Sequence, residues 1–246
     1  MLIECVPNFS EGARPDIVEA IVAKVRAESS ARVLDLQSDA SHNRSVLTLA
    51  GDADSLFNAT LALVGACLTV IDLRTHRGEH PRMGAVDVVP FIPLEGATIK
   101  DCVALARRVG EAIAKAHNVP VFLYEEAASA PHRKGLEDIR RGQFEGLEAK
   151  LKDPQWKPDF GPAEPHPSFG AVVVGARMPL IAFNVNLNTD DVEIAKKIAK
   201  GIRHSTGGYR FVKAMGLIVD INGRKVAQVS MNMTDFTKTP LFRVTE

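Results

Sequence analysis

Residues 74–84 concentrate the side chains of this chain that could carry out acid-base chemistry. Three arginines, two histidines and a glutamate lie within these eleven residues. An imidazole has an ordinary pKa of about 6.5, so a histidine that is held in place can both accept and release a proton near neutral pH. From residue types alone, a positioned acid-base site and an inert polar surface connection are both open.

A metal site is a third interpretation of the same segment. His76 and His80 are four residues apart, which is the spacing of two zinc ligands on one face of a helix. Gly78 and Pro81 disfavour that helix, because proline lacks an amide donor and restricts the residue before it. We therefore expect an irregular loop and no metal.

Two further polar clusters lie next to expected strands. Residues 39–44 connect two strands, and residues 8–12 follow the first strand. Such positions often form sites, but a turn and a helix cap would explain the same residue types. The sequence contains neither a phosphate-binding glycine motif nor the serine motif of hydrolases, so nucleotide binding and serine hydrolase chemistry receive no support.

Composition narrows the class of protein further. The chain has 246 residues, with 30 basic and 30 acidic side chains, so neither nucleic acid nor an anionic membrane is expected as a partner. Its three cysteines are scattered, which fits a reducing compartment, and the N-terminus lacks a signal-peptide pattern. The longest apolar stretch, residues 61–71, is too short to span a bilayer. We expect a cytoplasmic protein.

The hydrophobic pattern alternates between the periods of strands and helices, and this mixture favours an α+β fold with helices on one face of each sheet. We expect strands over residues 2–6, 31–36, 45–49, 85–92, 119–124, 171–175, 180–187, 211–220 and 225–233. We expect helices over residues 15–27, 54–70 and 98–116, and one after Thr189. Over residues 136–151 we expect a charged surface helix or a pair of short helices. Asn222-Gly223 indicates a hairpin between the last two strands.

Residues 153–170 interrupt this alternation. They contain five prolines, two glycines and the only tryptophan, Trp156. A loop of this length in a compact protein is usually functional or disordered, and its aromatic residues argue against simple disorder. We expect an ordered loop between two units of the chain.

Several longer motifs occur in order between residue 2 and about residue 236. They are Glu4-Cys5-Val6-Pro7-Asn8-Phe9-Ser10-Glu11-Gly12, Asn43-Arg44-Ser45-Val46, Gly78-Glu79-His80-Pro81-Arg82-Met83-Gly84-Ala85-Val86-Asp87, Pro90-Phe91-Ile92-Pro93, Pro158-Asp159-Phe160-Gly161-Pro162, Gly175-Ala176-Arg177 and Leu180-Ile181-Ala182-Phe183-Asn184-Val185-Asn186-Leu187. Together they resemble the glutamate formiminotransferase family, the formiminotransferase domain of the formiminotransferase-cyclodeaminases.

The resemblance implies two α/β lobes with folate held in a cleft between them. Residues 1–176 would form the N-terminal lobe, which includes an inter-lobe folate loop over residues 158–170. Residues 177–246 would form a shorter C-terminal lobe of ferredoxin-like type. Each lobe would be a mixed or antiparallel sheet with helices on one face.

The resemblance also implies a reaction. The family transfers the formimino group of N-formimino-L-glutamate to tetrahydrofolate in histidine degradation, giving 5-formiminotetrahydrofolate and L-glutamate. Tetrahydrofolate would be a co-substrate, and no metal is required. The family's catalytic histidine falls on His80, which would act first as general base and then as general acid.

Binding residues follow from the same resemblance. The folate-contacting segment falls on Gly161, Pro162, Ala163, Glu164, Pro165, His166, Pro167, Ser168, Phe169 and Gly170. Arginines suit the carboxylates of both substrates, and Arg44, Arg82 and Arg177 are the candidates. Asn8, Asn43 and Asn184 are candidates for hydrogen bonds to the pterin or the amidine.

This chain departs from the family pattern in two places. Gln37 stands where family members often carry an acid, although Asp39 lies close by in the sequence. The second lobe supplies a β-α-β-β order, which would lack one helix and one edge strand of a β-α-β-β-α-β unit. Either a second chain covers this face or the second lobe is less stable. Because family members are usually homodimers, we expect a homodimer that associates through that edge.

Other activities stay open at this stage. A close variant would transfer a formyl group in place of the formimino group. A different class of protein would bind folate, or act as half of a two-chain enzyme, with little or no turnover. A metal-dependent hydrolase that uses His76 and His80 is the remaining alternative.

Overall fold

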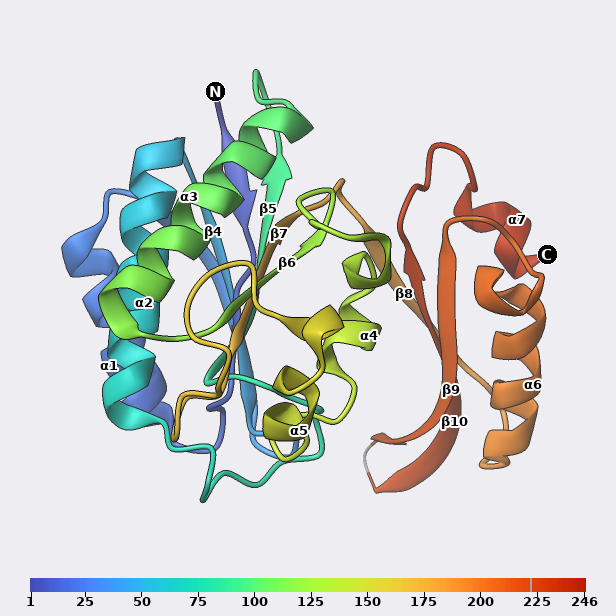
Figure 1. The fold of residues 1–246 in the computed structure, drawn as a ribbon. Coiled ribbons are helices and arrows are strands. Elements are labelled where there is room, and N and C mark those ends of the chain that lie inside the picture. The colour runs from blue at the N-terminus through green and yellow to red at the C-terminus, as the bar shows by residue number, and fades with distance from the viewer. Residues whose placement is uncertain (222) are drawn as a thin grey trace. The chain divides into compact units, whose positions relative to one another are not determined.

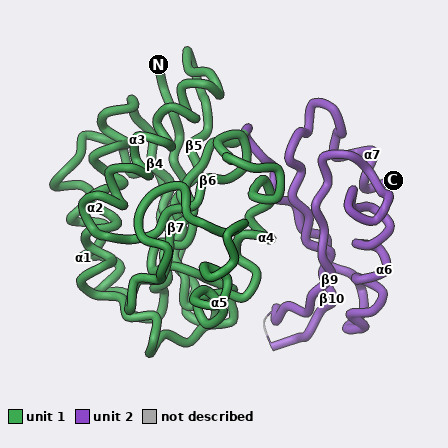
Figure 2. Tube along the Cα trace, viewed as in Figure 1, with its two compact units in different colours: residues 1–177 green, residues 178–246 purple. Residues whose placement is uncertain are grey.

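The computed structural model describes residues 1–221 and 223–246. The chain divides into two compact units, Met1–Arg177 and Met178–Glu246 (Figure 2). Unit 1 is built on a seven-stranded sheet, and unit 2 on a separate sheet of three strands.

The sheet of unit 1 is mixed. Its strands are β1 (Ile3–Cys5), β2 (Asn8–Phe9), β3 (Arg32–Asp39), β4 (Arg44–Gly51), β5 (Val86–Pro93), β6 (Val121–Glu125) and β7 (Val172–Ala176). β1 and β2 share one position, because each pairs antiparallel with both β4 and β5. β3 continues the sheet beyond β4, whereas β5, β7 and β6 pair in parallel on the other side.

Three long helices cover one face of this sheet (Figure 1). They are α1 (Pro15–Glu28), α2 (Ala53–Val70) and α3 (Ile99–His117). By length and composition alone α2 could cross a membrane. Its side chains from Leu56 to Cys67 instead contribute to the core of unit 1, as those of a core helix do.

Two short helices lie on the opposite face. In β6, Val121 and Leu123 point toward the long helices, while Phe122 and Tyr124 join a second core cluster. That cluster contains residues of α4 (Leu136–Arg140) and α5 (Leu147–Leu151). The expected pair of short helices is therefore confirmed, but it packs on the second face of the sheet, because the buried strands are apolar on both sides.

A buried ion pair holds the long loop against the sheet. Arg133 and Asp159 approach to 3.1 Å, and both side chains are only 8% exposed. The Asp159 carboxylate also accepts a hydrogen bond from the backbone amide of Leu123 (2.8 Å). This anchor fixes the start of residues 161–170 beside β6.

Unit 2 is an antiparallel sheet with a helix on one face. The strand order is β8 (Ile181–Asn186), β10 (Arg224–Met233) and β9 (Val212–Ile221). α6 (Val192–Ile202) packs closely because Ala195 and Ala199 are small and because Gly216 has no side chain; a Cβ there would lie 2.3 Å from the amide nitrogen of Lys196. This order is the β-α-β-β arrangement that the sequence predicted.

The predicted α+β architecture is confirmed, and most expected elements are present within a few residues of their expected bounds. β2 and the short C-terminal helix α7 (Leu241–Thr245) were not predicted, because neither is long enough to show a hydrophobic period. The predicted hairpin turn falls on Asn222, which lies outside the described residues. Arg224 and Ile221 on either side of it do pair across the two strands.

Candidate functional site

The segment between α2 and β5, residues 71–85, carries His76 and His80 and is called the histidine loop below. It is irregular, as Gly78 and Pro81 predict. Residues 76–82 contain no helix. At Gly78 the loop approaches the turn between β3 and β4 so closely that a Cβ would lie 2.3 Å from the carbonyl oxygen of His42. Only glycine permits this contact, and it brings residues 39–44 against the histidine loop.

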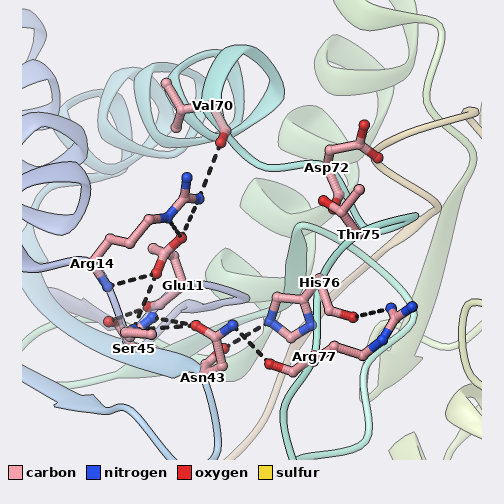
Figure 3. Close-up of polar contacts among 11 residues, drawn as sticks. Glu11, Arg14, Asn43, Ser45, Val70, Asp72, Thr75, His76 and Arg77 are labelled. Atoms are coloured by element: carbon pink, nitrogen blue, oxygen red, sulfur yellow. Dashed lines mark hydrogen bonds and ion pairs between the residues drawn. The ribbon is translucent and has the colours of Figure 1, made fainter.

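Asn43 joins the segments that meet at this point. Its side-chain oxygen accepts hydrogen bonds from the amides of Gly12 (3.0 Å) and Ala13 (3.2 Å), while its amide nitrogen donates to the carbonyl of Arg77 (2.8 Å). Its backbone oxygen lies 3.0 Å from Nε2 of His76. This contact is drawn in Figure 3. Asn43, predicted to contact a substrate, therefore uses its side-chain amide within the protein. Its backbone is left-handed, with φ of 48°, which asparagine tolerates better than most residues.

His76 is a structural residue in this arrangement. It is buried, its Nε2 donates to the Asn43 carbonyl, and its Nδ1 accepts from Nε of Arg82 (3.3 Å). Burial lowers the pKa of His76, so the ring is neutral at neutral pH. Both ring nitrogens are occupied, and the interpretation as a zinc pair with His80 therefore loses one of its two ligands.

Arg82 is also committed within the protein. Its guanidinium forms a two-pronged ion pair with Glu145, with nitrogen–oxygen distances of 2.7 and 2.9 Å, and a longer contact to Gln143 (3.3 Å). It thereby ties the histidine loop to the segment between α4 and α5. These contacts occupy all three nitrogens of the Arg82 guanidinium. It therefore has no free hydrogen-bonding edge for the substrate carboxylate that it was predicted to bind.

His80 differs from His76 in its surroundings. It is partly buried, and its pKa is lowered to about 3, first by burial and then by the charges of Arg44, Arg140 and His42. The rings of His42 and His80 are 6.3 Å apart and meet edge to face. A neutral imidazole in this position can accept a proton from a substrate, which is what a general base requires.

Arg44 and Arg140 form a positive region beside His80. Arg140 donates to the buried carboxylate of Asp87, which also accepts from the amide of Met83 (2.8 Å). The Nε atoms of Arg44 and Arg140 are buried and have no hydrogen-bond partner among the described residues. Burial, followed by the charge of Arg140, lowers the pKa of Arg44. An anion placed here would meet two incompletely paired guanidinium groups.

Sequence reasoning missed Arg140, Asp87 and His42. Arg140 lies in a charged segment that was interpreted as solvent-facing, and its partner is 53 residues away in the sequence. The sequence did contain one indication of this pair, because Asp87 is an acidic residue within an otherwise apolar strand. A buried carboxylate requires a partner, and the partner here is an arginine.

The predicted folate segment, Gly161 to Gly170, packs against both ends of the histidine loop. Ser168 accepts from the amide of Leu73, and Phe169 from that of Ala85, each at 2.8 Å. Residues 163–167 border a hollow of about 1070 Å³ within unit 1. It is also bordered by Leu73, Arg74, His76, Arg77, Gly78, Arg82, Gln143, Phe144, Glu145, Glu148 and Lys152. The structure thus brings the predicted folate segment and the histidine loop together around one space.

The structure places the other three predicted residues as follows. Asn8 sits in β2, where its side chain donates to the carbonyl of Val6 (3.2 Å). Arg177 follows β7, at the opposite end of the sheet from the histidine loop. Asn184 is exposed on β8 in unit 2.

A second hollow, of about 430 Å³, lies between the start of the histidine loop and residues 10–14. Glu11 borders it and is buried, because its carboxylate accepts from the amides of Ala13 and Arg14 and pairs with the Arg14 guanidinium (Figure 3). His76 and Arg77 border both hollows. The Glu11 carboxylate thus satisfies the amides of the two residues that precede α1, within the turn that leads into this helix.

The role of His76 predicts a difference between two substitutions. In His76→Gln, the side-chain amide can donate to Asn43 and accept from Arg82, so we expect unfolding free energy within about 1 kcal/mol of wild type. His76→Leu leaves two buried partners unsatisfied and should cost about 2–4 kcal/mol by urea denaturation. Equal losses of stability in both variants would contradict the role of His76 as a hydrogen-bonding link between Asn43 and Arg82.

Comparison with known proteins identifies the family of the chain. Residues 2–177 match the model of the formiminotransferase domain, N-terminal subdomain, and residues 182–246 match that of the formiminotransferase domain. A glutamate formimidoyltransferase of Streptococcus pyogenes serotype M1 is 48% identical, over 100% of this chain and 81% of the relative. One of Thermoplasma acidophilum is 44% identical over 100% and 80%.

Bifunctional relatives are similar over part of their length. A formimidoyltransferase-cyclodeaminase of Rattus norvegicus is 43% identical, over 100% of this chain and 46% of the relative. Two family models that together cover nearly all of the chain, and relatives at this level of identity, leave no ambiguity of assignment. The chain belongs to the formiminotransferase family.

Proposed function

We propose that this chain transfers the formimino group of N-formimino-L-glutamate to tetrahydrofolate, giving 5-formiminotetrahydrofolate and L-glutamate. The observation that carries the proposal is the neutral imidazole of His80 beside the incompletely paired guanidinium groups of Arg44 and Arg140. Two relatives named for this activity are 44% and 48% identical to the chain over its whole length. The activity places the chain in histidine degradation and one-carbon metabolism.

The reaction needs one group that first takes up and then returns a proton. Nitrogen-5 of the folate attacks the central carbon of the amidine, and the tetrahedral centre then loses the proton of that nitrogen. The departing glutamate nitrogen must gain a proton as its bond to carbon breaks. His80 is the group that we assign to both transfers, because its low pKa keeps it neutral as a base and makes its protonated form a strong acid.

The donor's carboxylates fit the positive region next to His80. We assign them to Arg44 and Arg140 in place of Arg82, whose guanidinium is used by Glu145. A bound carboxylate would partly neutralise the two arginines and so raise the pKa of His80 toward its ordinary value. Donor binding would in this way strengthen the base that acts on the folate.

Residues 161–170 are the segment that we assign to folate. They border the larger hollow of unit 1 together with the histidine loop. Homodimer formation, which the resemblance implies, stays a prediction that light scattering of the purified chain tests. Location in the cytoplasm stays a prediction from the composition. No observation favours a formyl donor over a formimino donor.

Replacing His80 tests the proposed reaction directly. We expect His80→Ala to lower kcat about 10²–10⁴-fold in an assay with formiminoglutamate and tetrahydrofolate, because acid-base catalysis contributes about that much. Folate binding, followed by calorimetry, should stay within about twofold of wild type. Undiminished turnover would remove His80 from its role, and a wild type that binds folate without turnover would favour a binding protein.

Replacing Arg44 tests where the donor binds. Arg44→Gln removes a charge-assisted contact worth about 1.5–3 kcal/mol, so KM for formiminoglutamate should rise about ten- to a hundredfold. KM for folate should change little. Arg108→Gln, on an exposed arginine of α3 paired with Asp54, is the matched control and should leave both values unchanged. A rise confined to the folate KM would contradict the assignment.

A further inference from the structure

His42 lies at the tip of the turn between β3 and β4, and Asp39 orients its ring. The Asp39 carboxylate accepts from the backbone amide of His42 (2.8 Å) and lies 3.1 Å from Nδ1 of the same residue. The side chains are 45% and 52% exposed, so water reaches both. A carboxylate this close to Nδ1 sets the orientation of the ring.

The turn is held against the histidine loop at three points. The amide of Glu79 donates to the carbonyl of Ser41 (3.2 Å), Asn43 donates to the carbonyl of Arg77 (2.8 Å), and Gly78 contacts the carbonyl of His42. These backbone contacts place the rings of His42 and His80 at 6.3 Å between centroids, with an interplanar angle of 60°. A centroid separation of 6.3 Å leaves room for about one bridging water molecule between the two rings.

The charges around the two rings are opposite. His80 faces Arg44 from β4 and Arg140 from α4, and the Asp87 carboxylate of β5 is already paired with Arg140. His42 faces Asp39 of its own turn. Two guanidinium groups thus lie on the His80 side of the pair and a carboxylate lies on the His42 side, and this asymmetry gives a proton a direction of movement between the rings.

We propose that His42 is the proton-relay partner of His80, acting through it and oriented by Asp39. This relay rests on the proposed formimino transfer. When nitrogen-5 of the folate bonds to the amidine carbon, its proton passes to His80 and through water to His42. When the bond from that carbon to the glutamate nitrogen breaks, the electron pair stays on nitrogen, and the proton returns through His80 to it. No net proton is gained or lost.

His42→Gln separates a relay from a structural role. Glutamine keeps the backbone contact to Asp39 and a polar side chain but cannot carry a proton. We expect kcat to fall about tenfold or more while the KM of each substrate stays within about twofold. Added imidazole, a diffusible proton carrier, should restore most of the lost rate. Asp39→Asn should lose less, and should lose nothing further when combined with His42→Gln.

His132→Gln is the matched control, because His132 is an exposed histidine whose ring contacts the carbonyl of Gln155. We expect its kcat to equal that of wild type. A charge at His42 is one cause of the low pKa of His80, so His42→Gln should also raise the titration midpoint of His80 in NMR spectra.

The outcomes separate the two levels of the proposal. An unchanged kcat in His42→Gln, or a loss that imidazole does not restore, would overturn the relay while leaving the transferase activity in place. A His80 midpoint that does not move would overturn the pairing of the two rings. No turnover by wild type would overturn the proposed function and the relay with it.

Discussion

The arrangement of this site depends on the docking of the β3–β4 turn onto the histidine loop. Asn43 makes that contact, with its side chain bonded to Gly12, Ala13 and Arg77 and its carbonyl bonded to His76. No single bond among these is strong, since each contributes about 1 kcal/mol net. Together these bonds fix the β3–β4 turn, residues 12–13 and the histidine loop relative to one another. His80 lies on the histidine loop close to that junction.

An electrostatic imbalance follows from that geometry. Arg44 enters on β4 immediately after the docked turn, and Arg140 reaches the same place from α4. Asp87 forms a direct ion pair with Arg140, whereas Asp39 and Asp87 act on Arg44 without such a pair. The remaining positive charge keeps His80 neutral and prepares the region for an anionic ligand. The stability lost by placing these like charges together is offset by the large core of unit 1, which surrounds the sheet on both faces.

The sequence was sufficient for the architecture and made His80 the candidate base, but it did not reveal the contacts of the neighbouring residues. Helix and strand periods are local properties, and the apolar stripe of α1 or the buried strand β5 could be predicted from them. The pairing of Arg82 with Glu145 joins residues 63 apart, and that of Arg140 with Asp87 joins residues 53 apart. No local pattern encodes such pairs. Arg82 was therefore assigned to a substrate, and Arg140 to the surface.

The titration of His80, followed by NMR of its ring proton in the free protein, tests most directly whether neighbouring guanidinium groups set its basicity. The structure predicts that the ring stays neutral far below pH 6.5, with a pKa near the value of about 3 given by burial and by Arg44, Arg140 and His42. Because Arg44 lowers this pKa, Arg44→Gln must raise it. A wild-type midpoint close to 6.5 that Arg44→Gln leaves unmoved would contradict the account.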